Sequence, residues 1–344
     1  MKRKILIKNL EIGGDSNIKI QSMTNTKTSN VLATIEQIKQ LEKVGCDIVR
    51  VSVPDKESAL AISDIKKEID VPLVADIHFD YKLAIESIKS GVDKIRFNPG
   101  NIGCESNVKY LVDVLKEYNI PVRIGVNSGS IEKEFLHLSL PEGMCKSVFK
   151  HLRLLEKFGY YNIVLSAKAS NVQDTITTYR LIDKECDYPL HLGVTEAGVY
   201  EDSLIASSIG IGSLLADNIG DTIRVSITGD PTLEVTAAKG ILKALNKYDK
   251  PFVKVVSCPT CARTEIPVEM LVNQVKKAVE GINKNLTIAI MGCVVNGPGE
   301  SKRADIGIAG GKDKSVIFKN GQILKVINNN DGIVDYLVQL IKEI

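Results

Sequence analysis

The sequence has almost no net charge, because its 344 residues include 44 basic and 42 acidic side chains, which leave a formal charge of +2. No overall field therefore attracts nucleic acid or a membrane surface, and no basic stretch with interleaved aromatic residues supplies one. Long apolar runs are also absent, and charge interrupts the opening Met-Lys-Arg-Lys-Ile-Leu-Ile-Lys before an apolar signal core forms. We expect a cytoplasmic protein in which any anion site is local.

Histidine is scarce too, and none follows His191, although three cysteines lie in that region. The Cys-x-x-Cys pair Cys258 and Cys261, with a distant third thiol at Cys293, is typical of a metal or iron–sulfur site. Three thiolates without a nearby fourth fit a structural zinc poorly, and Glu300, after a Pro-Gly turn, is the candidate fourth ligand. On spacing alone, a redox dithiol or a tolerant zinc site stays open.

The remaining cysteines are scattered through the first part of the chain. Seven is an odd number, and in a reducing compartment such thiols stay free or bind metal. We interpret the four that lie apart as packing residues: Cys46, Cys104, Cys145 and Cys186.

The length exceeds the usual single-core limit of about 250 to 300 residues, so a large domain and a small one are expected. After a hairpin that should turn at residues 13–15, short strand-like runs alternate with amphipathic helical stretches. Eight such units in about 230 residues indicate a TIM barrel more than a doubly wound sheet. We expect its strands at 18–23, 48–53, 73–77, 94–98, 122–126, 162–167, 190–194 and 222–227, and its last helix at 231–245.

A linker follows the repeat, so we assign residues 1–247 to the barrel and 251–344 to a small α+β domain of ferredoxin-like or sulfite-reductase-like type. The candidate metal ligands lie on loops that follow two of its strands. In this domain we expect strands at 252–257, 287–292, 304–309, 315–318 and 322–327, and helices at 267–282 and 331–344.

Cationic side chains recur at one parity of the barrel strands. Alternate residues of a strand face opposite sides, so this parity faces the barrel axis, and a TIM barrel has its active site at the strands' C-terminal ends. Arginine binds phosphate oxygens in a bidentate manner, and lysine adds a point charge. The pattern predicts a site for a multiply charged anion, formed by Arg50, Arg96, Arg123, Lys168 and Arg224, with Asn127 and Ser226 on the same parity.

A salt bridge to a barrel carboxylate is the alternative for any one of these cations. Asp76 and Glu196 are too few to neutralise all five. Glu196 follows the seventh strand, in a loop where catalytic side chains of this fold collect, and neighbouring cations should keep it ionised.

Several motifs together resemble the 4-hydroxy-3-methylbut-2-en-1-yl diphosphate synthase family, in its shorter two-domain bacterial form. The family usually has glycine where this chain has Ala262, which removes no ligand. The motifs are Ser257-Cys-Pro-Thr-Cys-Ala-Arg-Thr, Gly292-Cys-Val-Val-Asn-Gly-Pro-Gly-Glu, Gln21-Ser-Met-Thr-Asn-Thr, Arg96-Phe-Asn-Pro-Gly-Asn-Ile-Gly, Arg123-Ile-Gly-Val-Asn-Ser-Gly-Ser, Gly193-Val-Thr-Glu-Ala-Gly and Asp217-Asn-Ile-Gly-Asp-Thr-Ile-Arg.

The resemblance implies a two-electron reductive ring opening and dehydroxylation of 2-C-methyl-D-erythritol 2,4-cyclodiphosphate to 4-hydroxy-3-methylbut-2-enyl diphosphate, in the non-mevalonate isoprenoid pathway. It implies that the barrel cations hold the diphosphate and that Glu196 manages a proton. It further implies a 4Fe-4S cluster on Cys258, Cys261, Cys293 and Glu300, with Glu300 on an exchangeable, catalytic iron. Reduced flavodoxin or ferredoxin is the implied donor, because no Gly-rich dinucleotide fingerprint follows any strand.

Two other functions stay open. A transferase resembling the pterin-binding barrels would explain the cations but leave the metal domain merely structural. An iron–sulfur electron carrier would explain the cysteines but leave the cationic mouth idle. We also expect a head-to-tail homodimer in which each small domain caps the partner's barrel, because the last barrel helix ends on the face opposite the site and the linker is short.

Overall fold

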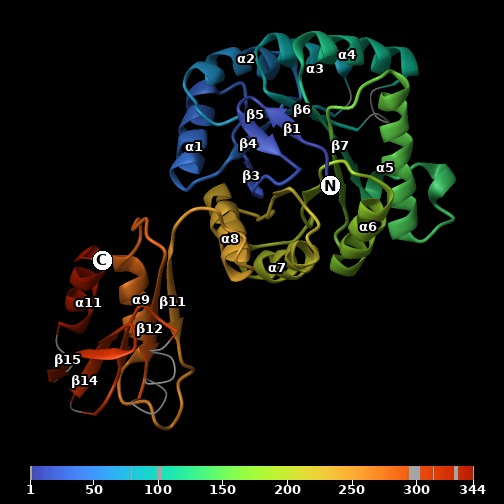
Figure 1. Ribbon diagram of the computed structural model, residues 1–344. Helices are drawn as coiled ribbons and strands as arrows, with labels where there is room; N and C mark the ends of the chain where they lie inside the picture. The colour runs from blue at the N-terminus through green and yellow to red at the C-terminus, as the bar shows by residue number, and fades with distance from the viewer. Residues whose placement is uncertain are drawn as a thin grey trace. The chain divides into compact units, whose positions relative to one another are not determined.

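A computed structural model describes residues 2–78, 80–98, 103–293, 303–312, 314–328 and 332–343. The chain forms two compact units, Met1–Tyr248 and Asp249–Ile344, which Figure 1 colours from blue to yellow and from orange to red. Within the described ranges, every helix is too short or too polar to cross a membrane.

The first unit is a parallel eight-stranded barrel, which confirms the predicted TIM barrel. A single bridge between Leu165 and Leu190 joins the two ends of the sheet. β9 at this junction and its other neighbour, β10, are only two residues long each, so regular pairing is shortest in this part of the barrel. Around the barrel the order is β8 (Ile163–Lys168), β7 (Val122–Asn127), β6 (Lys94–Phe97), β5 (Leu73–Asp76), β4 (Ile48–Ser52), β3 (Lys19–Met23), β10 (Thr222–Ile223) and β9 (His191–Leu192).

Helices follow the strands and cover the outside of the sheet (Figure 1). Aliphatic residues of the outward strand parity pack beneath them in one continuous core. Several helices begin with an Asn or Asp whose side chain accepts a bond from a first-turn amide, as Asp230 does from Thr232. The helices are α1 (Val31–Lys43), α2 (Lys56–Lys67), α3 (Tyr81–Lys89), α4 (Glu105–Tyr118), α5 (Leu140–Lys157), α6 (Val172–Glu185), α7 (Tyr200–Ala216) and α8 (Pro231–Ala244), with short 3-10 turns η2 (Ser128–Ser130) and η3 (Lys133–Phe135).

An N-terminal hairpin closes the barrel end opposite the predicted site. Its strands are β1 (Ile5–Ile7) and β2 (Leu10–Ile12), and their isoleucines pack on Ile48 and Val74 inside the barrel. The expected turn at 13–15 was wrong, because the chain reverses at Lys8 and Asn9, where Lys8 has a φ of 54°. The glycines at 13 and 14 instead lead the chain from the hairpin into β3.

The second unit has one five-stranded sheet in sequential order, with its first three strands parallel and its last two antiparallel to their neighbours. Two helices cover one face with an aliphatic core. The α+β character agrees with expectation, but a sequential order is not the interleaved order of a ferredoxin-like sheet. The elements are β11 (Val253–Ser257), α9 (Val268–Ala278), β12 (Leu286–Met291), β13 (Ile306–Ala309), β14 (Lys314–Lys319), β15 (Gln322–Asn328) and α11 (Ile333–Glu343).

Candidate active site

The structure brings the five predicted cations together inside the barrel. Arg50, Arg96 and Lys168 are each 8% exposed and Arg123 is 1% exposed, whereas Arg224 is partly buried. All lie on the parity that faces away from the aliphatic core around the sheet. The fields of the four arginines all reach Lys168, so the five charges occupy one region.

Asp76 neutralises part of this positive charge. Its carboxylate accepts a hydrogen bond from Arg96 at 2.9 Å and lies 3.7 Å from Arg50. Burial alone would raise the pKa of Asp76, but Arg50, Arg96, His78 and Arg123 lower it to about 2. The carboxylate is therefore ionised at neutral pH and holds two of the arginines in place.

Glu234 is the second internal carboxylate, and the sequence analysis missed it. It lies in the first turn of α8, is 3% exposed, and binds Arg224 through both oxygens at 2.9 and 3.1 Å. Ser22 donates to the same carboxylate at 2.7 Å. Its signal in the sequence was its helical spacing to the buried Ala238 and Ile241, which places an acid on the apolar face of α8.

Arg123 and Lys168 have no carboxylate partner among the described side chains. Arg123 donates to the Gln21 amide oxygen at 3.3 Å. Burial, together with neighbouring arginines, lowers the pKa of both cations well below their ordinary values. A site with buried, unpaired cations favours an anionic ligand, because the ligand supplies the missing negative charge.

Two glycines leave space for two of these cations. A Cβ at Gly125 would lie 2.6 Å from Nε of Arg96, and one at Gly193 would lie 2.8 Å from Nζ of Lys168. The guanidinium and the ammonium thus lie directly against the backbone of neighbouring strands. Any side chain at either position would displace a cation.

The remaining predicted barrel residues lie at the C-terminal ends of the strands. Asn127 ends β7 as an exposed residue in register with Lys168, and Ser226 is partly buried after β10. Glu196 is exposed in the loop after β9, with a φ of +54° that is unusual for a residue other than glycine. Backbone bonds from Thr195 to Ala169 and from Thr228 to Gly198 tie this loop to its neighbours.

A lysine inside the barrel was also missed. Lys94 is wholly buried in β6, two residues before Arg96 and on the same strand parity. That shared parity was its signal. The Nζ atom of Lys94 has no hydrogen-bond partner within the described ranges.

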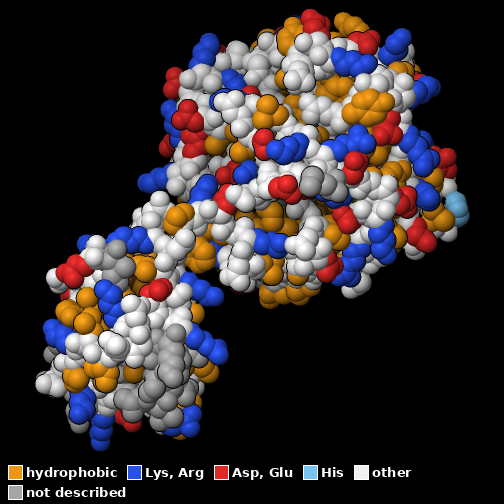
Figure 2. All heavy atoms as spheres, in the orientation of Figure 1, with side chains coloured by type: hydrophobic (Ala, Val, Ile, Leu, Met, Phe, Trp, Pro, Cys, Tyr) orange, Lys and Arg blue, Asp and Glu red, His pale blue; other side chains and the backbone are white. Residues whose placement is uncertain are grey.

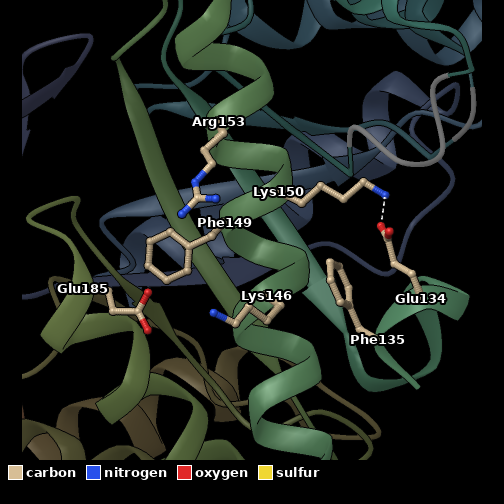
Figure 3. Close-up of a pocket in the computed structure, with 7 residues that line it drawn as sticks. All are labelled: Glu134, Phe135, Lys146, Phe149, Lys150, Arg153 and Glu185. Atoms are coloured by element: carbon tan, nitrogen blue, oxygen red, sulfur yellow. Dashed lines mark hydrogen bonds and ion pairs between the residues drawn. The ribbon is translucent and has the colours of Figure 1, made fainter. Parts of the chain in front are cut away.

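Charges of both signs are mixed on the barrel face that Figure 2 shows. A hollow of about 420 Å³ on the outer face of α5 is lined by Lys146, Lys150 and Arg153, but also by acids (Figure 3). Lys150 there is paired with Glu134 at 2.6 Å, so this hollow is not the predicted anion site.

In the second unit, the cysteines follow two adjacent parallel strands. Cys258 comes directly after β11 and Cys293 shortly after β12. The Gly292 amide donates to Sγ of Cys258 at 3.1 Å, which joins the two loops. Cys293 is buried and Cys261 is exposed, in a turn held by Thr264.

The donor chemistry of these loops fits an iron–sulfur cluster. Thiols from both loops, and an amide already directed at a sulfur, match the ligands and hydrogen bonds that such clusters use. Within the described part of the chain, no three Cys, His, Asp or Glu side chains form a complete ligand group. Glu300 lies outside the described residues.

The other cysteines divide by environment. Cys46 and Cys145 are buried, and burial raises the pKa of each thiol to about 12, as expected of packing residues. Cys186 is partly buried. The interpretation of Cys104 was wrong, because its thiol is exposed at the start of α4 and contacts Ser106 at 2.9 Å.

Known proteins match both units. The GcpE TIM-barrel domain matches residues 2–239, and the GcpE protein C-terminal domain matches residues 254–343. A 4-hydroxy-3-methylbut-2-en-1-yl diphosphate synthase (flavodoxin) from Caldanaerobacter subterraneus is 56% identical over 99% of this chain and 96% of its own length. The equivalent protein from Clostridium acetobutylicum is 52% identical over 98% of this chain and 97% of its own length.

Solved structures with similar barrels are much more distant in sequence. Dihydropteroate synthase from Stenotrophomonas maltophilia has a TM-score of 0.53 at 13% identity, over 71% of this chain and 98% of its own. N-acetylneuraminic acid synthetase from Leptospira borgpetersenii has a TM-score of 0.51 at 11% identity, over 71% of this chain and 90% of its own. These likenesses extend to the fold alone, whereas the full-length matches show that the chain belongs to the GcpE family of 4-hydroxy-3-methylbut-2-en-1-yl diphosphate synthases.

Proposed function

We propose that this protein reduces 2-C-methyl-D-erythritol 2,4-cyclodiphosphate to 4-hydroxy-3-methylbut-2-enyl diphosphate, in the cytoplasm and as part of the non-mevalonate pathway. The observation that carries the proposal is the family match across both units, at 56% identity to a protein with that activity in its name. The buried, under-neutralised cations independently favour a small phosphorylated substrate.

The barrel residues bind and orient the diphosphate. Arg123 and Lys168 are the primary contacts, because no described carboxylate competes for them. Arg50, Arg96 and Arg224 are pre-oriented by Asp76 and Glu234, so the ligand meets fixed donors rather than flexible ones. The polar side chains of Asn127 and Ser226 complete the contacts at the strand ends.

The second unit holds the redox cofactor. Cys258, Cys261 and Cys293, with Glu300, would bind a 4Fe-4S cluster. When bound, such a cluster supplies single electrons and a Lewis-acidic iron. The Gly292 amide at Cys258 stabilises negative charge on that sulfur and so helps set the potential.

Glu196 transfers the proton that leaves with the substrate oxygen. It is exposed at the barrel mouth, on a loop bonded to the loops on either side. Its left-handed backbone conformation holds the side chain at one direction from the loop. Closure of the site around the substrate would bring this carboxyl out of bulk water.

The electron donor is reduced flavodoxin, which the names of the relatives specify, with ferredoxin as a chemically equivalent alternative. The two rival functions are less well supported. A pterin-type transferase shares only the barrel fold with this chain, at 13% identity for the dihydropteroate synthase from Stenotrophomonas maltophilia. An electron carrier would leave the buried cations without a purpose.

The working enzyme is a head-to-tail homodimer in which each cluster serves the partner's barrel. Eight residues, 245–252, separate α8 from β11. Fully extended, these residues span at most roughly 29 Å, which is about the height of a barrel with its loops. The linker therefore leaves no slack for the second unit to reach the mouth of its own barrel. Exposed apolar residues on α7 support pairing with a second copy, since Ile205 and Ile209 are 63% and 51% exposed one turn apart, and Leu233 on the neighbouring α8 is 38% exposed.

Anaerobic purification tests the proposal directly. We expect a coloured protein with iron and sulfide in equal amounts, which converts the cyclodiphosphate when reduced flavodoxin is supplied. A colourless, zinc-loaded protein without this turnover would contradict it. The same sample with Cys293→Ser is the matched control, because it retains the barrel.

A further inference from the structure

Four buried polar side chains inside the barrel, one of them the proposed substrate cation Arg123, form a layer of unsatisfied groups. Gln21, Lys94, Arg123 and His191 each have a buried side-chain nitrogen without a hydrogen-bond partner among the described residues. The atoms are Nε2, Nζ, Nε and Nε2, respectively. Buried polar atoms are normally satisfied, so this layer requires an explanation.

Lys94 begins β6, on the side of the closed end of the barrel. It is in register with Val74, which packs against the hairpin at the closed end of the barrel. Arg96 follows two residues later on the same parity and is in register with Arg123. Lys94 therefore lies deeper in the barrel than Arg96, on the side of the apolar floor.

Among the residues that the structure describes, no carboxylate pairs with the amine of Lys94. Asp76 is shared by Arg50 and Arg96, and Glu234 is bound by Arg224. The pKa of Lys94 lies well below its ordinary value, mainly because the side chain is buried and secondly because of the charge on Arg123. The titratable and charged groups around the layer are Arg50 on β4, Asp76 on β5, Arg96 on β6, Arg123 on β7, Lys168 on β8, His191 on β9, Arg224 after β10, Tyr179 on α6 and Glu234 on α8.

We propose that Lys94 is a neutral amine in the substrate-free barrel and takes up one proton from solvent when a cyclic diphosphate binds above it. The inference rests on the proposed function, because it requires that this ligand enter the barrel. Each phosphoryl group of the ligand brings a negative charge, which stabilises a buried ammonium that the free barrel cannot stabilise. No covalent bond changes, and the amine gains only a proton.

The role of Lys94 is positioning, since it acts on the ligand through Arg123 and does not touch it. Once charged, it adds one positive charge beneath the diphosphate and repels Arg123 toward the ligand. Binding linked to proton uptake weakens as pH rises, because fewer protons are available for the bound form. Affinity for the diphosphate should therefore fall with pH above neutrality.

Calorimetry on the anaerobic, cluster-loaded enzyme measures this uptake. The substrate is titrated without reductant at pH 8 in buffers of different ionisation enthalpy, and the slope of observed heat against that enthalpy counts protons. We expect net uptake by the parent protein, with Lys94→Met reducing it by about one proton per substrate bound. Lys109→Met, on the exposed side of α4, is the matched control and should leave the count unchanged.

Lys168 could also take up a proton, because burial lowers its pKa too, and the Lys94→Met difference separates that uptake from the uptake by Lys94. His191 could take part of the proton, because the pKa of its buried imidazole is also lowered, by burial and then by Arg123, Lys168 and Lys94. A His191→Gln variant measures that share in the same titration. An undiminished count in Lys94→Met overturns the proposal. So does a parent protein that binds substrate without net uptake, a result that needs no variant to fold.

A substrate-free measurement tests the neutral amine separately. With a lowered pKa in the folded state, the unfolded chain binds the extra proton, so stability rises with pH up to the ordinary lysine pKa. We expect the parent's Tm to rise between pH 7 and 9 more steeply than that of Lys94→Met. Parallel curves overturn the proposal, whereas absence of any binding of the cyclodiphosphate would instead overturn the proposed function.

Discussion

The two units hold their functional side chains in opposite ways. In the barrel, the cations come from strand interiors and are fixed by Asp76, Glu234 and the backbone at glycines. In the second unit, the thiols lie on loops beyond strand ends, and Cys261 is exposed. Ion pairs and backbone contacts thus hold the barrel cations in place before a ligand arrives, whereas the cysteine loops need their cofactor to define a ligand geometry.

This difference shows how each unit positions its functional side chains. Backbone pairing in a sheet fixes the position of each side chain, so the barrel can hold several like charges close together although they repel one another. Loops adapt to a cluster whose own bonds set the geometry. Substitutions in one unit should therefore leave the chemistry of the other intact. Variants of each unit test whether the two functions are separate in this way.

The largest effect is expected from Cys293→Ser. Removing one of three thiolates should abolish the iron–sulfur absorbance and reduce turnover to background, because no other cysteine of the second unit replaces it. The barrel should still bind the cyclodiphosphate with the parent's affinity. Visible spectroscopy and calorimetry check the two halves of the prediction, and a loss of substrate affinity would refute the separation of the units.

We expect Arg96→Ala or Arg123→Ala to have the opposite effect, which is weaker substrate binding with an intact cluster. Each removes a charge-assisted contact, so substrate binding should weaken by roughly ten- to a hundredfold, or about 1.5 to 3 kcal/mol. The cluster spectrum should be unchanged. Arg153→Ala, on the outer face of α5, is the matched control for loss of an arginine.

A smaller effect concerns Asp76, which supports the barrel site rather than forming it. Its pKa of about 2 lies below the ordinary value, so its ion pairs stabilise the fold above about pH 4, and that stability is lost as pH falls toward 2. Asp76→Asn should lower the free energy of unfolding at pH 7 by about 2 to 3 kcal/mol. Denaturant titrations should show this difference closing between pH 4 and 2, while Asp113→Asn, exposed on α4, shows no such closing.

Much of the barrel could be predicted from the sequence because period and parity are local signals. The eight strands and the axial cations follow from alternation alone, even where β9 and β10 are only two residues long. The partners of those cations could not be predicted in the same way. Glu234 belongs to a helix 10 residues after Arg224, and only tertiary packing turns its side chain into the barrel.

The second unit was less predictable for a physical reason. The cysteine spacing indicated a metal, but the sheet order depends on long-range pairing that composition does not encode. Cys104 illustrates the same limit, because an isolated thiol has no periodic neighbour that would distinguish a core position from a helix start. The hairpin turn at Lys8 was missed because Gly13 and Gly14 were the stronger local turn signal.

The smallest predicted effect tests whether the two kinds of site meet across a dimer. Cys293→Ser supplies an intact barrel without a cluster, and Arg96→Ala combined with Glu196→Gln supplies a cluster with a disabled barrel. In an equal mixture that exchanges subunits freely, half of the dimers are mixed and each has one competent pair, so activity should recover to about a quarter of the parent's.

Recovery requires that the intact barrel and the intact cluster come from different chains, because neither variant contains both. Mixing at a protein concentration too low for association should give no recovery, which separates assembly from slow reconstitution of either variant. A site made within one chain would regain nothing at any mixing ratio. That result, or a strictly monomeric active enzyme by light scattering, would confine each barrel to the cluster of its own chain.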